Sequence, residues 1–138
     1  MTHLIVSCDG AARGNPGPAG AGALLTTIDG TVVAEIAEGL GEATNNVAEY
    51  TAAIRGMERA AELGADEITL RSDSQLFVNQ LLGRYRVRAA HLVPLYERAR
   101  ALVRGFRRVR FEHVPREQNR DADRLANAAV DAWLAGDG

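Results

Sequence analysis

The sequence has one cysteine, no lysine and no long apolar run. A lone Cys8 cannot form an internal disulfide framework, which indicates a reducing compartment and predicts a cytoplasmic location. No apolar segment approaches the length of a transmembrane helix, so we expect no membrane partner. The first residues show no basic segment followed by a long apolar stretch, and the sequence therefore indicates no signal peptide.

The remaining composition is typical of a globular protein, with 46% hydrophobic and 25% charged residues in a chain of 138. This length is enough for one domain with a sizeable core, and the sequence contains no repeat or linker. We therefore expect a single domain over residues 1–138. Two alternatives stay open, a free-standing protein and an N-terminal domain of a longer one.

Charge is distributed unevenly along the chain although the net charge is only −2. Residues 1–83 hold four Arg against eleven Asp and Glu, whereas residues 84–124 hold twelve Arg against five. A basic segment beside an acidic one favours a surface for a polyanion next to a metal-binding pocket. The alternative is a set of solvated helix faces.

Hydrophobic periodicity and turn signals predict the element order βββαβααβα. A meander followed by crossover helices implies an α/β fold with a mixed sheet covered by helices. Gly20 and Gly22 indicate close backbone approach within the second strand. The expected strands are 4–8, 19–27, 31–40, 67–71 and 109–114, and the expected helices are 44–63, 75–82, 91–103 and 119–134.

Four carboxylates fall at element ends, where sites in open α/β sheets form. We expect Asp9 to end the first strand and Asp73 to end the fourth, with Glu49 and Asp123 in the first turns of two helices. Each has an ordinary structural explanation. Asp9 could stabilise its own turn, Glu49 could favour the helix dipole, Asp73 could be an N-cap and Asp123 could be solvated.

Together with their flanking residues, the four carboxylates resemble the ribonuclease H type I family from about residue 4 to residue 133. That resemblance implies a five-stranded mixed sheet, with the first three strands antiparallel and about four flanking helices. The motifs that carry it are Cys8-Asp-Gly-Ala, Gly14-Asn-Pro-Gly-Pro, Thr44-Asn-Asn-x-x-Glu, Ser72-Asp-Ser-Gln and Ala122-Asp-x-Leu-Ala.

The resemblance implies an endonuclease that hydrolyses the RNA strand of RNA/DNA hybrids and leaves 5′-phosphate and 3′-hydroxyl ends. Two Mg²⁺ ions, with Mn²⁺ as a substitute, would be bound by the four carboxylates. Asp9 would bridge both ions, Asp123 would complete the ion that activates water, and Glu49 and Asp73 would hold the ion beside the leaving 3′ oxygen. We expect a monomer.

Asp121 and His113 lie near the fourth carboxylate in the sequence. The apolar stripe of the last helix does not decide between Asp121 and Asp123, but the family pattern selects Asp123. His113 lies ten residues earlier and resembles a family histidine that shuttles a proton during product release. Its alternative is a histidine that is hydrogen-bonded locally at a strand end.

The resemblance also implies a substrate-binding set. RNA-strand contacts would come from Gly10, Ala11, Asn15, Asn46 and Gln75. Asn15 and Thr44 would lie near a DNA phosphate. Discrimination by the 2′-hydroxyl and by duplex shape requires such short polar groups and backbone amides. Helix capping is the alternative role for the Asn45-Asn46 pair, and a plain turn is the alternative for Gly14–Pro18.

The chain departs from the best-known bacterial pattern because no extra basic helix and loop follow residue 83. It therefore resembles the compact members of the family, some of which also cleave double-stranded RNA, and that second substrate stays open. Arg84, Arg86 and Arg88 would replace part of the missing handle through phosphate contacts.

The sequence leaves three alternatives to a ribonuclease function. An integrase-like strand transferase would share the acidic cluster, but the Asn-Pro-Gly-Pro and Thr-Asn-Asn motifs argue against it. A domain that only binds hybrids would not need all four carboxylates. A generic metal-binding structural protein is the third alternative.

Overall fold

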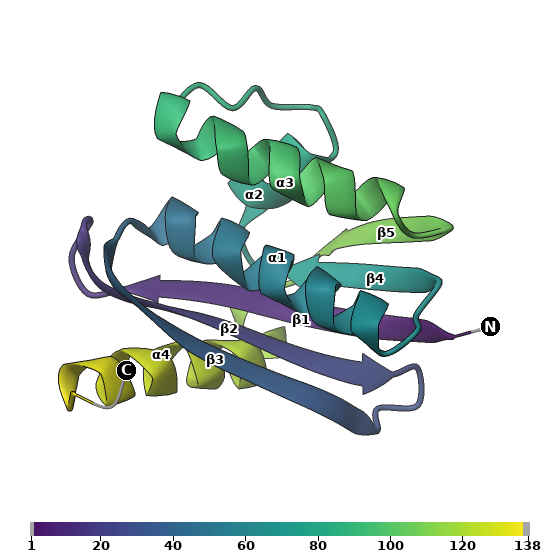
Figure 1. Ribbon diagram of the computed structural model, residues 1–138, viewed down its shortest axis with the longest axis horizontal. Helices are drawn as coiled ribbons and strands as arrows, with labels where there is room; N and C mark the ends of the chain where they lie inside the picture. The colour runs from purple at the N-terminus through teal and green to yellow at the C-terminus, as the bar shows by residue number, and fades with distance from the viewer. Residues whose placement is uncertain (1, 137–138) are drawn as a thin grey trace.

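The computed structural model describes residues 2–136 and contains one five-stranded mixed sheet between two layers of helices (Figure 1). The strand order is β3-β2-β1-β4-β5, with β1 to β3 antiparallel and β4 and β5 parallel to β1. The expected α/β architecture and element order are thus confirmed. The strands are β1 (His3–Ala12), β2 (Gly17–Thr27), β3 (Val32–Ala43), β4 (Glu67–Ser72) and β5 (Arg108–His113), and the α-helices are α1 (Asn45–Glu62), α2 (Gln75–Leu81), α3 (Val93–Arg104) and α4 (Arg120–Leu134).

Helices α1 and α4 lie on opposite faces of the sheet (Figure 1). Helix α1 buries Tyr50, Ile54 and Met57 in the main core, which also contains Val6 and Leu25 from the sheet. Burying a side chain of this size stabilises the fold by roughly 1.5–3 kcal/mol. Helices α2 and α3 extend this layer beyond β4 and β5.

Helix α4 covers β2 and β3 with a stripe of mostly small residues. Ala122, Ala126 and Ala129 are fully or almost fully buried, and Leu125 and Val130 complete the stripe. The 3.6-residue period of these positions explains why one helix face can lie flat on the sheet. The small side chains bring the backbone of α4 close to the strands.

Strand β1 is longer than the sequence predicted, and Asp9 does not end it. β1 continues to Ala12 because it keeps pairing with β2, whereas its pairing with β4 stops at Ser7 and Arg71. Gly10 and Ala11 therefore belong to the strand rather than to a loop. Asp9 and Asp73 each lie two residues beyond the last β1–β4 pair, at the point where these two strands separate.

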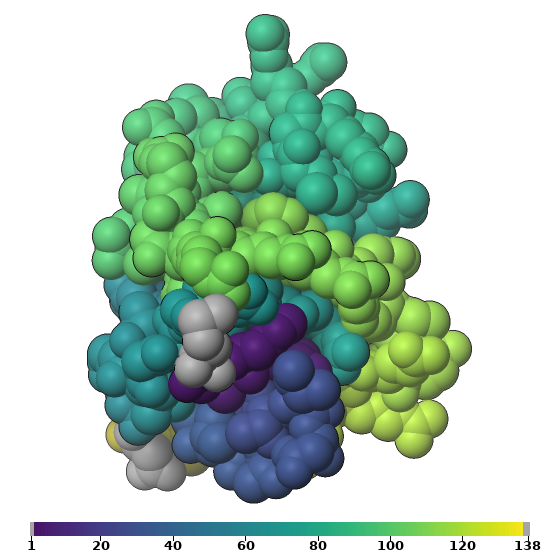
Figure 2. Space-filling model, turned by 90° about the vertical axis from the view of Figure 1, so that its right-hand side faces the viewer, coloured from purple at the N-terminus to yellow at the C-terminus, as the bar shows by residue number. Residues whose placement is uncertain are grey.

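The connection between α2 and α3 is short and contains no additional α-helix. Residues 82–89 lead into a single 3-10 turn, η1 (Ala90–Leu92), and α3 then begins with Pro94 in its first turn. The expected helix from His91 thus starts as this 3-10 turn. The absence of the extra helix confirms the compact type, and this region forms the top of the molecule in both Figure 1 and Figure 2. Within residues 2–136, no helix is long and apolar enough to cross a bilayer.

Candidate active site

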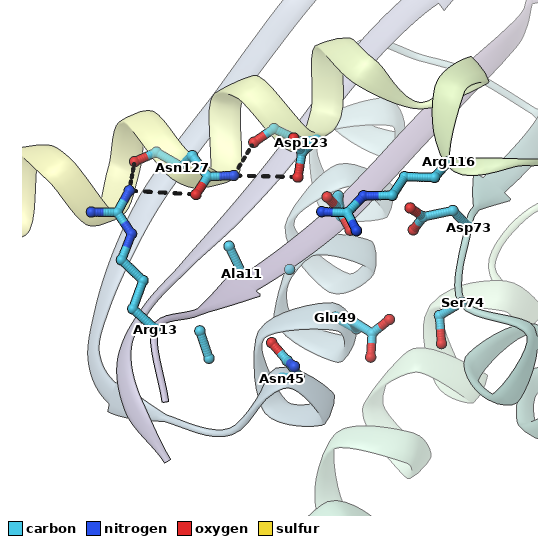
Figure 3. A pocket seen from close by; sticks show the side chains of 12 residues that line it. Ala11, Arg13, Asn45, Glu49, Asp73, Ser74, Arg116, Asp123 and Asn127 are labelled. Atoms are coloured by element: carbon cyan, nitrogen blue, oxygen red, sulfur yellow. Dashed lines mark hydrogen bonds between the residues drawn. The ribbon is translucent and has the colours of Figure 1, made fainter. Parts of the chain in front are cut away.

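Four carboxylates from four different segments line one pocket of about 540 Å³ (Figure 3). Asp9 comes from β1, Glu49 from α1, Asp73 from the residue after β4, and Asp123 from the first turn of α4. Asp9 is only 8% exposed, so the pocket has a buried acidic floor. The structure therefore brings together the four carboxylates that the sequence singled out.

Two glycines beside Asp9 allow both helices to approach it. Gly22 lies opposite Asp9 in the β1–β2 ladder, and a Cβ atom there would overlap the backbone of Ala122 and Ala126 in α4. A Cβ atom at Gly10 would overlap the backbone at the start of α1, including the amide of Glu49. Because both positions lack a side chain, the helix turns that carry Glu49 and Asp123 can lie next to Asp9.

The start of α1 is fixed by two side-chain acceptors. Thr44 is the N-cap and its Oγ1 accepts from the amide of Val47 at 3.2 Å. Asn15, in the β1–β2 loop, accepts from the amide of Asn45 through Oδ1 at 3.1 Å. These bonds satisfy amides at the helix N-terminus and tie the loop to the turn that carries Glu49.

The start of α4 is tied to β1 by Asn119. Its Nδ2 donates to the carbonyl oxygen of Cys8 at 3.0 Å, and the residue is only 2% exposed. Its side chain makes no capping bond to its own helix. One buried amide therefore joins the residue before Asp9 to the helix that carries Asp123.

Burial and mutual repulsion make two of the carboxylates hard to ionise. Burial, the charge of Asp73 and a hydrogen bond with Asp123 together raise the pKa of Asp9 to about 8. Burial also raises the pKa of Glu49 to about 7, against a hydrogen bond with Ser74 that lowers it. Nearby cations would relieve this cost, so the pocket favours binding positive charge.

The donor set fits hard divalent cations. Carboxylate oxygens are the ligands that Mg²⁺ prefers, and Mg²⁺ keeps several waters rather than requiring a complete protein cage. Among residues 2–136, no three Asp, Glu, His or Cys side chains converge on one point as ready ligands. The four carboxylates line the same hollow, so a cation bound there would relieve the repulsion between them.

Asp121 and His113 lie outside the pocket lining. Asp121 is exposed and pairs with Arg124 at 3.7 Å, whereas Asp123 faces the other carboxylates. His113 ends β5 and is exposed, with its Nε2 3.3 Å from the carbonyl oxygen of Asp73. The histidine is thus next to the pocket, at the backbone of one of its acidic residues.

The expected substrate-binding residues are divided among three places. Gly10 and Ala11 line the acidic pocket. Asn15 and Thr44 meet at the start of α1, as described above, and Gln75 is exposed at the start of α2. The remaining members lie together in a second pocket: Asn46, Arg84, Arg86 and Arg88.

This second pocket has a volume of about 610 Å³ and contains one buried polar side chain, Gln80, which is 6% exposed. The hydroxyl of Tyr50 donates to Oε1 of Gln80 at 2.6 Å, so the amide is held in one orientation. Tyr85, which is half-exposed, also lines the pocket. Seven arginines elsewhere form ion pairs, whereas in the described chain Arg84, Arg86 and Arg88 form none.

Several residues that line the acidic pocket were not predicted from the sequence, among them Arg116, Asn127 and Arg13. Arg116 follows β5 and extends its guanidinium into the hollow (Figure 3). Asn127 and Arg13 line the pocket on the side of α4 and the β1–β2 loop. Asn127 could have been found, because it lies four residues after Asp123 and therefore on the same helix face. Arg116 carries no such spacing signal.

Comparison with known proteins gives a consistent match over most of the chain. A family model described as reverse transcriptase-like matches residues 7–129. A bifunctional protein of Mycobacterium tuberculosis (strain ATCC 25618 / H37Rv) is 50% identical over 130 residues, covering 94% of this chain and 36% of that protein. The chain thus spans about a third of that relative. The solved N-terminal RNase H domain of this M. tuberculosis protein, fused to maltose-binding protein, has a TM-score of 0.95 at 47% identity over 100% of both chains.

Two further proteins extend the comparison. Ribonuclease HI of Halobacterium salinarum (strain ATCC 700922 / JCM 11081 / NRC-1) is 50% identical over 123 residues, covering 89% of this chain and 62% of that protein. The structure of LC11-RNase H1 in complex with an RNA/DNA hybrid matches with a TM-score of 0.90 at 39% identity, over 95% of this chain and 99% of that one.

Proposed function

The chain belongs to the ribonuclease H family, and on that basis we propose that it is an endonuclease that hydrolyses the RNA strand of RNA/DNA hybrids. One observation carries the proposal. Four carboxylates from β1, α1, the end of β4 and α4 line one pocket in a chain that matches RNase H domains over its whole length. The products would carry 5′-phosphate and 3′-hydroxyl ends.

Asp9, Glu49, Asp73 and Asp123 are the residues that would hold two Mg²⁺ ions, or Mn²⁺ in their place. Bound there, the cations would neutralise phosphate charge and lower the pKa of an attacking water. The raised pKa values of Asp9 and Glu49 support this assignment, because a buried acidic group without a partner is costly to ionise.

Two basic side chains next to the carboxylates would assist the reaction. Arg116 would donate to a phosphate oxygen of the substrate, since a guanidinium matches phosphate geometry. His113 would move a proton between the pocket and solvent through its ring nitrogens, because it is exposed and lies at the backbone of Asp73.

The RNA strand would lie against Gly10 and Ala11, which line the acidic pocket beside the carboxylates. Asn15 and Thr44 would contact a DNA phosphate from the start of α1. Asn46 lines the second pocket from the first turn of α1, and Gln75 is exposed at the start of α2; both would contact the hybrid.

The second pocket would bind the phosphate backbone farther from the cleavage site. Three arginines without acidic partners and the oriented amide of Gln80 make it suitable for an anion. This pocket lies in the short connection that takes the place of the basic protrusion of other family members. It supports the proposal that Arg84, Arg86 and Arg88 replace that handle.

A direct test is to incubate the protein with labelled RNA/DNA hybrid, double-stranded RNA or double-stranded DNA, each with Mg²⁺, Mn²⁺ or EDTA. We expect cuts within the RNA strand of the hybrid that need a divalent ion and disappear in Asp73→Asn. Arg59→Ala, an exposed residue at the far end of α1, is the matched control and should cleave normally.

The other outcomes separate the alternatives. Cleavage of double-stranded RNA would add that substrate to the hybrid. Strand transfer or cleavage of DNA alone would point to an integrase-like enzyme and contradict the proposal. Hybrid binding without any cut, under every metal condition, would identify a binding domain and also contradict it.

A further inference from the structure

We infer that Asn127 is a positioning residue for Asp123 and that Arg13 keeps Asn127 in the required orientation. The inference rests on the proposed function, since it gives Asp123 a role in holding a cation. Its basis is a chain of hydrogen bonds along α4 that reaches from the β1–β2 loop to the acidic pocket (Figure 3).

The first link joins Asn127 to Asp123. Nδ2 of Asn127 donates to the side-chain Oδ1 of Asp123 at 3.2 Å and to its backbone oxygen at 3.0 Å. These bonds fix one carboxylate oxygen against the helix and leave the other free to face Asp9. Because Asp123 lies in the first turn of α4, a swing about its side-chain bonds would otherwise carry the carboxylate out toward solvent.

The second link fixes which way the amide of Asn127 faces. Nη2 of Arg13 donates to Oδ1 of Asn127 and to its backbone oxygen, each at 3.4 Å. A guanidinium can only donate, so the oxygen of the amide must face Arg13 and its nitrogen must face Asp123. The reversed amide would place oxygen against a carboxylate oxygen and nitrogen against a cation.

The third link holds Arg13 itself. Its Nη1 pairs with Asp131 at 2.7 Å, one turn farther along α4, and its backbone amide donates to the carbonyl oxygen of Pro18 at 2.9 Å. The loop that begins after Ala12 is thereby attached to the helix that carries Asp123. A substrate strand that presses on this loop would act on the orientation of Asp123 through the same bonds.

The inference predicts an effect on cation binding in the absence of substrate. Hydrogen bonds that orient a metal ligand typically contribute about 10- to 100-fold to metal affinity or activity. We therefore expect Asn127→Ala to weaken Mn²⁺ binding by about 10-fold in calorimetry of the substrate-free protein. At saturating hybrid, kcat should fall similarly and recover in part at high Mn²⁺, with the KM for the hybrid unchanged.

Four variants and a control complete the experiment. Asn127→Leu keeps side-chain volume without a donor and should match Asn127→Ala. Arg13→Ala should give a smaller loss, and the double variant should lose no more than Asn127→Ala alone, because both residues act through one hydrogen bond. Arg124→Ala, on the same helix with its ion pairs to Glu35 and Asp121, should behave as wild type.

The results distinguish failure of the inference from failure of the proposed function. If wild type binds no Mn²⁺ and cuts no hybrid, the proposed function and the inference are both contradicted. If wild type does both and the variants match it within about twofold, Asn127 does not position Asp123 and the function stands. The Asn127 variants in α4 could fail to fold, which a loss of cooperative thermal unfolding would show. In that case Arg13→Ala, in the exposed loop, tests the inference by itself. A wild-type Mn²⁺ affinity in Arg13→Ala would then overturn the inference.

Discussion

Gly22 lies directly opposite Asp9 in the β1–β2 ladder, and it is the absence of a side chain at Gly22 that lets α4 reach Asp9. The backbone of Ala122 occupies the space that a Cβ atom would need. Asp123 follows Ala122 directly, so the packing of a glycine against a helix determines how close two acidic groups can come.

Replacing Gly22 with Ala should therefore push α4 away from the sheet. We expect a loss of about 1–3 kcal/mol in the free energy of unfolding, because overpacking a tight contact forces the backbone to shift. Hybrid cleavage should fall as well, since Asp123 would move away from Asp9. Urea unfolding and single-turnover kinetics measure the two effects.

The matched control is Gly105→Ala. Gly105 has a negative φ of −76°, and a Cβ atom there would make one contact of 3.2 Å, with the oxygen of Leu102. Its loss of stability should be clearly smaller, and cleavage should stay normal. Equal losses in the two variants would show that the close approach at Gly22 has no special importance.

Asp9 should make the metal-free protein less stable as pH rises. Its pKa is about 8 in the folded chain and near its usual value of 3.8 in the unfolded chain. Between these values the unfolded chain has lost the proton and the folded chain keeps it, so stability falls from about pH 4 to about pH 8. In EDTA at pH 8, Asp9→Asn should therefore unfold at a higher temperature than wild type.

The difference between Asp9→Asn and wild type should shrink to almost nothing well below the unfolded-state pKa of 3.8, where both states of the wild type carry the proton. Asp121→Asn is the control, because Asp121 is exposed and outside the acidic pocket, and it should track wild type at every pH. An Asp9→Asn variant less stable than wild type at pH 8 without metal would contradict the account of a strained acidic pocket.

Removal of His113 should slow turnover without weakening substrate binding. Moving a proton through a positioned side chain typically contributes about 10²-fold or more to a rate. We expect His113→Ala to lower kcat under saturating hybrid and to leave KM unchanged, while His91→Ala, at an exposed position in η1, leaves both unchanged. A kcat equal to wild type would remove the proton-shuttle role.

The arginines of the second pocket should control how hybrid affinity depends on salt. Each phosphate contact releases counterions and contributes about −0.9 to the slope of log affinity against log salt. Replacing Arg84, Arg86 and Arg88 with Ala should raise KM and leave kcat near wild type. The slope of log affinity against log salt should become less steep by about 2 to 3.

A second triple variant controls for net charge. It replaces three arginines that already pair with acidic side chains, namely Arg59, Arg98 and Arg124. Its salt dependence should stay close to that of wild type. Equal slopes for the two triple variants would mean that the second pocket makes no specific phosphate contact.

Much of the fold could be predicted from local pattern, because hydrophobic periodicity and turn residues act over short stretches. The length of β1 could not, since its continuation past Asp9 depends on pairing with β2. The sequence indicated close approach at Gly22 but not its partner, since α4 lies about a hundred residues later.

The site residues that stand in a local motif could be predicted from the sequence. Those that only tertiary packing brings to the site could not. Asp9 and Asp73 stand in recognisable local sequences, and each lies two residues past the last pair of the β1–β4 register. The orientation of Gln80 depends on the hydroxyl of Tyr50, thirty residues away, and no local pattern contains that information. Arg116 reaches the pocket only through the path of the chain after β5.

The most direct test of the central claim is the rate of hybrid cleavage at saturating substrate with Mg²⁺ for Asp123→Asn and Asp121→Asn. The two residues are neighbours in the same helix turn, but only Asp123 lines the acidic pocket. The account predicts that Asp123→Asn abolishes cleavage and that Asp121→Asn cleaves as wild type. Loss of cleavage in Asp121→Asn with normal cleavage in Asp123→Asn would contradict it.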